Sequence, residues 1–337
     1  MWGPNSLKSI LVTGGAGYIG SHVVRQLSEA GYEVLIYDNL STGFADALIY
    51  DEKLIVGDLS DSNLLQSIFQ NYSIEAVLHF AASIVAPESV VNPLKYYHNN
   101  TSNTLQLIRT CVQHQIDKFV FSSTAAVYGE PPSGFASEGT SAMPMNAYGT
   151  SKLMSEWILR DTAIAHKFRY VALRYFNVAG ADPQGRMGQR TRQATHLIKV
   201  CCQAALGMRE SVSIYGTDYA TPDGTGIRDY IHIEDLASAH LAALNYLKRS
   251  EKAHTILNVG YGRGSSVKEV VDMVKQVSGV DFPVIEAPRR AGDPAKLVAC
   301  ADFIKETLNW QPKREGLQNI VQDAFQWEKK LYNITKT

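Results

Sequence analysis

The sequence predicts an α/β protein with a doubly wound parallel sheet, followed by a smaller α/β domain that is partly interleaved with the first. Short runs of β-branched residues alternate with longer segments of helical periodicity through the first half of the chain, which is typical of consecutive β-α-β units. The length of 337 residues also suggests two domains, at roughly 150 residues each.

Six strands are expected in the first half, each a short apolar run that a helical pattern follows in most cases. They cover residues 9–13, 33–37, 54–56, 76–80, 118–122 and 170–174. Helices are expected later, at residues 234–247, 266–277 and 320–331. We predict that residues 1–176, with a return of the chain near residues 228–255, form the first domain and residues 177–337 the second. The polar stretches 180–192 and 216–230 are too rich in Gly, Asp, Arg and Thr for core strands and are expected to be ligand-facing loops.

Composition and charge narrow the class of function. The chain has 32 Lys and Arg against 33 Asp and Glu, so its net charge of −1 disfavours non-specific binding to nucleic acid. Its four cysteines show neither metal-ligand spacing nor a disulfide pattern, and we see no apolar run typical of a signal peptide or a membrane span. We therefore expect a cytoplasmic protein with no metal, no nucleic-acid partner and no membrane segment.

A glycine-rich motif follows the first expected strand and opens a helical pattern. Residues 13–20 read TGGAGYIG, which spaces Gly14, Gly17 and Gly20 three residues apart. Gly14 permits a tight turn, Gly17 lets the backbone approach a pyrophosphate, and Gly20 lets the helix pack closely on the strand. Because a helix N-terminus also attracts an anion, the motif predicts a Rossmann-type dinucleotide site; the alternative is a plain glycine-rich turn.

Acidic residues end the next two strands. Asp38 lies 18 residues after Gly20, where a carboxylate can bind the ribose hydroxyls of NAD and would repel the 2′-phosphate of NADP. The alternative is that Asp38 and Asn39 only form a turn. Asp58 could contact the adenine or, equally, cap a helix over residues 60–69.

A tyrosine and a lysine four residues apart begin a later helix, so Tyr148 and Lys152 face the same side of it. The spacing alone is common. However, the strand at residues 118–122 runs into Ser123 and Thr124, which places a hydroxyl at the carboxyl edge of the sheet, where open α/β folds bind ligands. An ammonium about 4 Å from the phenol would supply roughly the 4 kcal/mol that lowers its pKa from about 10 to about 7.

In this order the glycine motif, the strand-end hydroxyl and the Tyr-x-x-x-Lys helix resemble the extended short-chain dehydrogenase/reductase superfamily. The stretches TGGAGYIGSH, HFAA, PESV, FSSTAAVYG, YGTSK, LRYFNVAGA, DGTGIRDYIH and APRRAGD look like the UDP-glucose 4-epimerase family and extend over residues 13–293. The resemblance implies an isomerase of nucleotide-sugar and galactose metabolism that keeps NAD bound. It also implies a homodimer built from helices at residues 93–114 and 148–166. There Leu105, Ile108 and Val112 form an apolar stripe, which burial within one chain would explain equally well.

The same resemblance assigns the chemistry. It makes Tyr148 the acid/base, Lys152 its activator and a ligand of the nicotinamide ribose, and Thr124 the hydroxyl that bridges Tyr148 and the substrate O4. The C4 carbon of a UDP-hexose is oxidised with NAD as hydride acceptor while Tyr148 takes the hydroxyl proton. The resulting 4-keto sugar turns its other face before the hydride returns, so the reaction is an epimerisation without net redox change.

By resemblance, the cofactor residues are Gly14, Gly17, Tyr18, Ile19, Gly20, Asp38, Asn39, Asp58, Leu59, Phe80, Ala81, Asn99, Ser122, Tyr148, Lys152 and Tyr175. The substrate residues are Thr124, Tyr148, Asn177, His196, Leu197, Tyr215, Arg228, Arg290, Asp293 and Leu297. Two positions depart from the family pattern: His196 stands where asparagine is frequent, and Ile84 where some members have lysine near the cofactor phosphate. Leu297 is expected at the wall beside the 2-substituent of the sugar; the alternative is that it packs in the core.

Two other functions stay open. A nucleotide-sugar 4,6-dehydratase shares the fold, NAD and the Tyr-Lys pair, but it needs a further acid and base where this chain has Ala125 and Ala126. A non-catalytic NAD-binding regulatory protein tends to lose the tyrosine or the lysine, and this chain retains both.

Overall fold

The structure is a computed structural model that describes residues 8–191, 194–251, 254–290 and 292–336. The chain divides into two compact units. The first comprises residues up to Val127, Pro144–Arg174 and Ala237–Leu257; the second comprises Tyr128–Met143, Tyr175–Leu236 and the residues from Asn258 on. The expected division placed Tyr128–Met143 in the first domain. It belongs to the second unit because its strand β6 (Phe135–Ala136) pairs in parallel with β14 (Lys296–Ala299).

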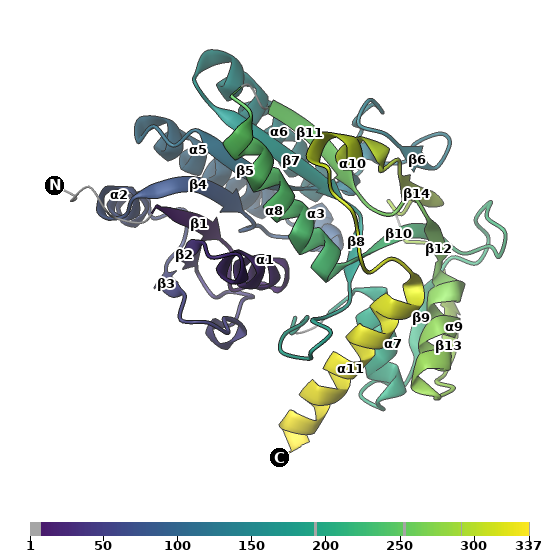
Figure 1. The fold of residues 1–337 in the computed structure, drawn as a ribbon. Helices are drawn as coiled ribbons and strands as arrows, with labels where there is room; N and C mark the ends of the chain where they lie inside the picture. Colours follow the sequence, from purple (N-terminus) through teal and green to yellow (C-terminus); the bar gives the residue numbers. More distant parts are fainter. Residues whose placement is uncertain (1–7, 192–193, 252–253, 291, 337) are drawn as a thin grey trace. The chain divides into compact units, whose positions relative to one another are not determined.

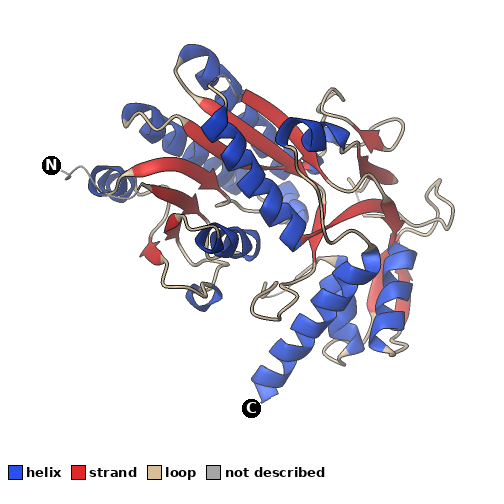
Figure 2. Ribbon diagram, viewed as in Figure 1, coloured by secondary structure: helices blue, strands red, loops and turns tan. Residues whose placement is uncertain are grey.

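The first unit is built on a seven-stranded sheet in the order β11-β7-β5-β4-β1-β2-β3 (Figures 1 and 2). Its strands are β1 (Ser9–Thr13), β2 (Glu33–Asp38), β3 (Lys53–Val56), β4 (Ile74–His79), β5 (Lys118–Thr124), β7 (Arg169–Tyr175) and β11 (His254–Val259). β1 pairs in parallel with β2 and β4, β2 with β3, and β4 with β5. This confirms the predicted doubly wound, Rossmann-type class.

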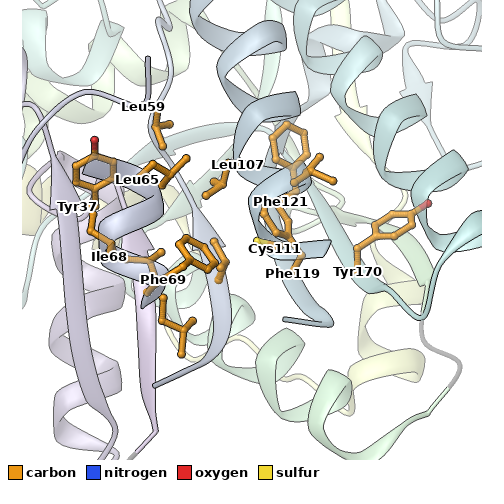
Figure 3. Close-up of a cluster of buried hydrophobic side chains, with 14 of the residues drawn as sticks. Tyr37, Leu59, Leu65, Ile68, Phe69, Leu107, Cys111, Phe119, Phe121 and Tyr170 are labelled. Atoms are coloured by element: carbon orange, nitrogen blue, oxygen red, sulfur yellow. The ribbon is translucent and has the colours of Figure 1, made fainter. Parts of the chain in front are cut away.

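Helices cover both faces of this sheet, because alternate strand residues point to opposite sides. Leu11 and Leu35 join an apolar cluster with side chains from three helices, which include the labelled Leu65 and Leu107 (Figure 3). The three helices are α2 (Ser62–Asn71), α5 (Asn103–Gln113) and α6 (Ala147–Ala165). On the other face, Val12, Ile36 and Val24 of α1 (Tyr18–Glu29) converge on Gly15. Side chains that meet a ligand are therefore expected at the carboxyl edge of the strands.

The six expected strands are all present, and their ends differ from the expected ones by two residues at most. The seventh strand, β11, was not expected. The remaining elements of this part of the chain are η1 (Ala45–Ala47), α3 (Ala86–Val91), α4 (Pro93–Tyr96), a π-helical turn η2 (Tyr97–Ser102), η3 (Ala125–Tyr128) and α8 (Ile233–Arg249). The segment from α4 through η2 into α5 runs without a break from Pro93 to Gln113.

The second unit contains two smaller sheets. A five-stranded sheet has the order β12-β10-β14-β6, with β8 paired to β10, and a two-stranded sheet joins β13 and β9. Its strands besides β6 and β14 are β8 (Asn177–Ala179), β9 (Val212–Tyr215), β10 (Ile227–His232), β12 (Gly264–Ser266) and β13 (Val284–Ala287). Its helices are α7 (Leu197–Ala205), α9 (Val267–Ser278), α10 (Asp302–Leu308) and α11 (Leu317–Lys336).

Strand β10 corrects one expectation. Residues 216–230 were expected to be loop because of their polarity, yet β10 begins at Ile227 and lies inside the five-stranded sheet. Its Asp229 is fully buried, and its carboxylate accepts hydrogen bonds from the backbone N–H groups of Tyr261, Gly262 and Ala299. A buried polar side chain is tolerated when its hydrogen-bonding groups are satisfied, and this is why a polar sequence forms a core strand here.

No helix among the described residues is long and apolar enough to cross a membrane.

Candidate active site

The glycine motif forms a tight turn between β1 and α1. Gly14 has φ +73°, and a side chain there would meet the backbone of Ala81 at 2.5 Å. A side chain at Gly20 would meet the carbonyl oxygen of Gly14 at 2.2 Å, so the start of α1 packs directly on the turn. Both glycines are therefore required by the local geometry, as the sequence predicted.

Gly17 is different, because its own surroundings leave more room. A Cβ atom at Gly17 would have one neighbour, the Gly14 carbonyl oxygen at 3.3 Å. Gly17 is the N-cap residue of α1 and provides no side-chain capping bond, and Tyr18 and Ile19 beside it are partly exposed. An uncapped N-terminus of a 12-residue helix, reached over a residue without a side chain, fits the pyrophosphate of a dinucleotide.

Asp38 connects the end of β2 to the glycine motif. Its Oδ2 accepts a hydrogen bond from the backbone N–H of Ala16 at 2.9 Å, and its Oδ1 accepts one from Leu40 at 2.8 Å. Asp38 therefore does form the turn that the sequence offered as an alternative, with Leu40 at φ +56°. The carboxylate oxygens keep further lone pairs, which could accept hydrogen bonds from ribose hydroxyls.

Asp58 does not cap the next helix. The N-cap of α2 is Asp61, whose side chain accepts from the N–H groups of Asn63 and Leu64, so the capping alternative for Asp58 is wrong. Instead, Asp58 accepts hydrogen bonds from Ser60 and from the Asn39 side-chain amide at 2.6 Å. These bonds lower the pKa of Asp58 against the opposing effect of burial and place its carboxylate beside Asn39.

Thr124, Tyr148 and Lys152 gather at the end of β5. Thr124 lies close enough to Tyr148 for its hydroxyl to lower the pKa of the phenol. Lys152, buried one helical turn along α6, donates to the carbonyl oxygen of Ser122 at 2.9 Å and lies over the Phe121 ring. Asn146 caps α6 by accepting from the N–H of Gly149, which begins the helix at Ala147 and brings Tyr148 into its first turn.

The pKa values of this group correct the expected electrostatics. Burial raises the pKa of Tyr148, and the hydrogen bond with Thr124 opposes that shift. Lys152 is not among the groups that lower the pKa of Tyr148, and burial brings the pKa of Lys152 itself down to about 7. An amine that is only partly protonated near pH 7 cannot supply the full charge that the estimate from the sequence assumed.

The other expected cofactor residues of the first unit lie around these two groups. The backbone N–H groups of Phe80 and Ala81 both donate to the carbonyl oxygen of Thr13, which ties the segment after β4 to the glycine motif. Asn99 donates to the Ser83 hydroxyl at 3.0 Å. Leu59 and Ser122 are buried, Ile84 is exposed, and Tyr175 is the first residue of the second unit after Arg174.

Three of the expected substrate residues line one cavity within the second unit. Asn177, His196 and Leu197 surround a space of about 40 Å³, together with residues of α7 and α11. His196 precedes α7 and Leu197 is its first residue, whereas Asn177 begins β8. Desolvation, and to a smaller extent the Lys199 ammonium, lowers the pKa of His196, although the side chain is solvent-exposed.

The remaining substrate residues lie on β9, β10, β14 and the segment before β14. The Arg290 guanidinium stacks on the Tyr215 ring at 3.6 Å, and the interaction lowers the pKa of that phenol. Arg228 on β10 pairs with Leu297 on β14 in the parallel register, and Leu297 is buried. Asp293 is exposed, and its N–H donates to the carbonyl oxygen of Arg290.

Comparison with known proteins decides the family. Residues 10–260 match the model of the NAD dependent epimerase/dehydratase family. The chain belongs to this family. A UDP-glucose 4-epimerase of Azospirillum brasilense is 54% identical over 322 residues, which cover 96% of this chain and 92% of that protein.

Solved structures of the family have the same fold. The UDP-glucose 4-epimerase from Brucella ovis in complex with NAD is 41% identical, with a TM-score of 0.91 over 95% of this chain and 98% of that one. The UDP-Glc/GlcNAc 4-epimerase from Campylobacter jejuni is 50% identical, with a TM-score of 0.84 over 96% and 99%.

A buried hydrogen-bond network connects β1 and β4, next to the glycine motif, with α5. Our interpretation of the sequence missed this network. His79 at the end of β4 bonds Thr13 through Nδ1 at 2.6 Å and Thr104 through Nε2 at 2.8 Å. Thr104 donates to the carbonyl oxygen of Asn100, so His79 donates from Nε2 and accepts at Nδ1. Burial lowers the pKa of His79 to about 3, which keeps the ring neutral.

Asn100 lies in the π-helical turn and extends this network. Its side-chain amide donates to the Ser83 carbonyl and to the Ser151 hydroxyl of α6, and its Oδ1 accepts from the N–H of Ser83. The neighbouring Asn99 bonds the same serine. Two consecutive asparagines inside a helix were the available signal, because Asn is unfavourable in a helix interior unless its side chain has a partner.

A second missed group holds α6 against the sheet. Glu156, one turn beyond Lys152, accepts from the Ser123 hydroxyl at 2.5 Å and pairs with Arg174 of β7. All three residues are buried. The negative charge of Glu156 opposes the fall in the pKa of Lys152, so this carboxylate also acts on the expected catalytic lysine.

Proposed function

We propose that this protein epimerises C4 of UDP-glucose and UDP-galactose through a 4-keto sugar, with NAD as its resident cofactor. The observation that supports this most is the placement of Tyr148 and the buried Lys152 in the first turns of α6 against the end of β5, where Lys152 donates to the Ser122 carbonyl and the Thr124 hydroxyl acts on the phenol. Curated relatives that share 54% and 46% of their residues with the chain are UDP-glucose 4-epimerases.

The chain's residues divide the work as follows. Bound NAD supplies the hydride acceptor and donor at C4. Tyr148 takes the proton of the C4 hydroxyl during oxidation and returns it during reduction, and Thr124 orients that hydroxyl through its bond to Tyr148. Lys152 holds Tyr148 and the ribose hydroxyls in register from its fixed place on the Ser122 carbonyl. Gly14, Gly17 and Gly20 with Asp38 hold the dinucleotide.

Substrate binding falls to the second unit. We assign the pyrophosphate to Arg228 and Arg290, and the uridine to Asn177, His196, Leu197, Tyr215 and Asp293, because arginine pairs well with phosphate and amide or carboxylate groups pair with ribose and base. We assign Leu297 to the wall beside the 2-substituent of the sugar. The epimerase from Campylobacter jejuni, named for both UDP-Glc and GlcNAc, supports weaker turnover of N-acetyl sugars here as well.

Two further proposals concern the whole protein. We place it in the cytoplasm, which its four free cysteines support. We also propose a homodimer through the helical segment Pro93–Gln113 and α6. Ile108 of the apolar stripe is buried in the core of its own chain, but Leu94, Leu105, Trp157 and Ile164 are exposed on these helices.

The proposal is tested with purified protein and UDP-galactose. We expect UDP-glucose as the product without added cofactor, and NAD in the supernatant after denaturation. A 4-keto-6-deoxy sugar would indicate a dehydratase, and no conversion together with no released NAD or NADH would reject the proposal.

A further inference from the structure

The side chain of Gln189 contacts the imidazole ring of His196 in the second unit. The side-chain Nε2 of Gln189 lies 2.9 Å from Nδ1 of His196. An amide nitrogen can only donate, so Nδ1 accepts and the proton of the neutral ring is on Nε2. His196 is also one of the residues that line the cavity of Asn177 and Leu197, and with Nδ1 accepting, its other ring nitrogen is a donor.

Gln189 is itself held from two helices. Its backbone carbonyl oxygen accepts a hydrogen bond from the Lys199 ammonium of α7 at 3.0 Å and another from the indole N–H of Trp327 of α11 at 3.2 Å. Lys199 also forms a buried ion pair with Glu328 at 2.5 Å. A side chain at Gly188 would meet the Trp327 ring at 2.6 Å, so the backbone before Gln189 lies flat on that indole.

The charged groups around the cavity favour the neutral ring. Lys199, Glu328 and Tyr230 line it together with His196, and Lys199 is paired with Glu328. The Arg209 guanidinium donates to the carbonyl oxygen of Ala194, on the segment before His196. Among the described residues that line the cavity, Glu328 is the one carboxylate, and Lys199 and Gln203 bond both of its oxygens.

We propose that Gln189 is a positioning residue that keeps His196 as an Nε2–H donor, and that this donor binds an acceptor oxygen of the UDP group. The inference rests on the proposed function, because it takes UDP-sugars as the ligand. In this way a histidine can replace the amide of an asparagine, since both present an uncharged N–H to the ligand.

NMR of protein whose histidines carry a nitrogen isotope label measures the tautomer directly. The signals that are lost in the His196→Asn variant belong to His196. We expect Nδ1 of His196 to be unprotonated and Nε2 protonated at pH 7, with or without UDP-glucose. A proton on Nδ1 would overturn the proposal whether or not the protein is an epimerase.

Replacing Gln189→Glu tests the role in binding. A carboxylate accepts from Nδ1–H, which reverses the tautomer at pH 8 and raises the pKa of His196, so that both nitrogens donate at pH 6. Relative to the parent, we expect the variant to bind UDP-glucose about tenfold more weakly at pH 8 and to recover most of this loss at pH 6. At each pH we divide the Kd of the variant by the Kd of the parent. This ratio removes any pH effect that other groups have on both proteins.

Gln66→Glu is the matched control, because Gln66 bonds His114 in the first unit and the substitution adds the same charge. We expect its Kd ratio to stay near one at both pH values. Measuring the binding of uridine alone shows which part of UDP holds the acceptor oxygen. If the Gln189→Glu variant shows the same Kd ratio with uridine, the acceptor is a base or ribose oxygen. If the ratio appears only with UDP-glucose, the acceptor is a phosphate oxygen.

A Gln189→Glu ratio that does not change with pH would overturn the proposal. If that variant fails to fold, the Gln189→Met variant and the NMR measurement on the parent test the proposal instead. A parent that binds no UDP-glucose would reject the proposed function and this inference together, whereas normal epimerisation with an Nδ1–H tautomer would reject the inference alone.

Discussion

The role proposed for Tyr148 requires a base near neutral pH in surroundings that raise its pKa. Burial favours the protonated phenol, and among the described residues only the Thr124 hydroxyl opposes this, while burial also lowers the pKa of Lys152 to about 7. We expect part of the charge that makes Tyr148 basic to come from the bound cofactor. The sequence identified these residues by their order along the chain, but it could not show the burial that sets their pKa values.

Replacing Tyr148→Phe should lower kcat by at least a hundredfold, because a general acid/base typically contributes 10²- to 10⁴-fold. The Kd of UDP-glucose should stay within about twofold, since the phenol hydroxyl acts on C4 and the UDP residues belong to the second unit. Tyr170→Phe is the control, as Tyr170 is a buried tyrosine of the first unit's core. A Tyr148→Phe variant that keeps more than half of the parent's kcat would show that the assignment is wrong.

Leu297→Tyr should suppress turnover of N-acetyl sugars and spare the plain hexoses. At the proposed wall of the sugar site, a leucine would leave partial room beside the 2-substituent, and a phenol ring would fill it. We expect kcat/KM for UDP-N-acetylglucosamine to fall at least about tenfold, a loss within the range that one steric contact can produce. Leu297→Met serves as the conservative control. Leu297 is buried, so equal losses for both sugar classes would favour the alternative that it only packs in the core.

Among the secondary-structure elements, strand β1, helix α1 and the turn between them were the most predictable part of the molecule. Its strand, turn and helix each follow from a local rule, namely an apolar run, a glycine at positive φ and an uncapped helix start. The π-helical turn at Tyr97–Ser102 and the buried strand β10 were not predictable in this way. Both contain polar residues that only distant partners satisfy, such as Ser83 for Asn100 and Gly262 for Asp229.

The π-helical turn leads to a prediction for Thr104. Thr104→Val keeps the shape of the side chain but leaves the buried Nε2–H of His79 without its acceptor, which should cost about 1–3 kcal/mol in the free energy of unfolding. The network ends beside the glycine motif at Thr13, so the variant should also retain less NAD through gel filtration.

Thr110→Val is the control for this experiment. Thr110 is also buried in α5, and its hydroxyl donates to the Gln106 carbonyl one turn earlier, outside the His79 network. We expect a smaller loss of stability and full NAD content. Equal NAD loss in both threonine variants would mean that the His79 network has no particular role in holding the cofactor.

At the level of the whole molecule, the fold class followed from periodicity, whereas the division into units did not. Each unit is made of three separate stretches of chain, and Tyr128–Met143 joins the second through a two-residue strand. Such a short strand has too few residues to show a period of two. Long-range pairing, rather than local pattern, determines where these segments belong.

The assembly can be tested on the exposed apolar residues of the helical pair. Trp157 is 48% exposed and Ile164 is 78% exposed, which is unusual for large apolar side chains on one helix and fits a contact with a second chain. We expect a dimer by light scattering at micromolar concentration and a monomer for Trp157→Glu. A parent that is monomeric at that concentration would reject the proposed dimer.

The central claim is that one hydride leaves C4 and returns to the same carbon within one protein. We would convert UDP-galactose that carries deuterium at C4 in ordinary water and locate the label in the product by NMR. We expect UDP-glucose with the deuterium retained at C4 and no hydrogen taken up from water. Deuterium found at C6 of a keto-deoxy sugar, or lost to solvent, would contradict it.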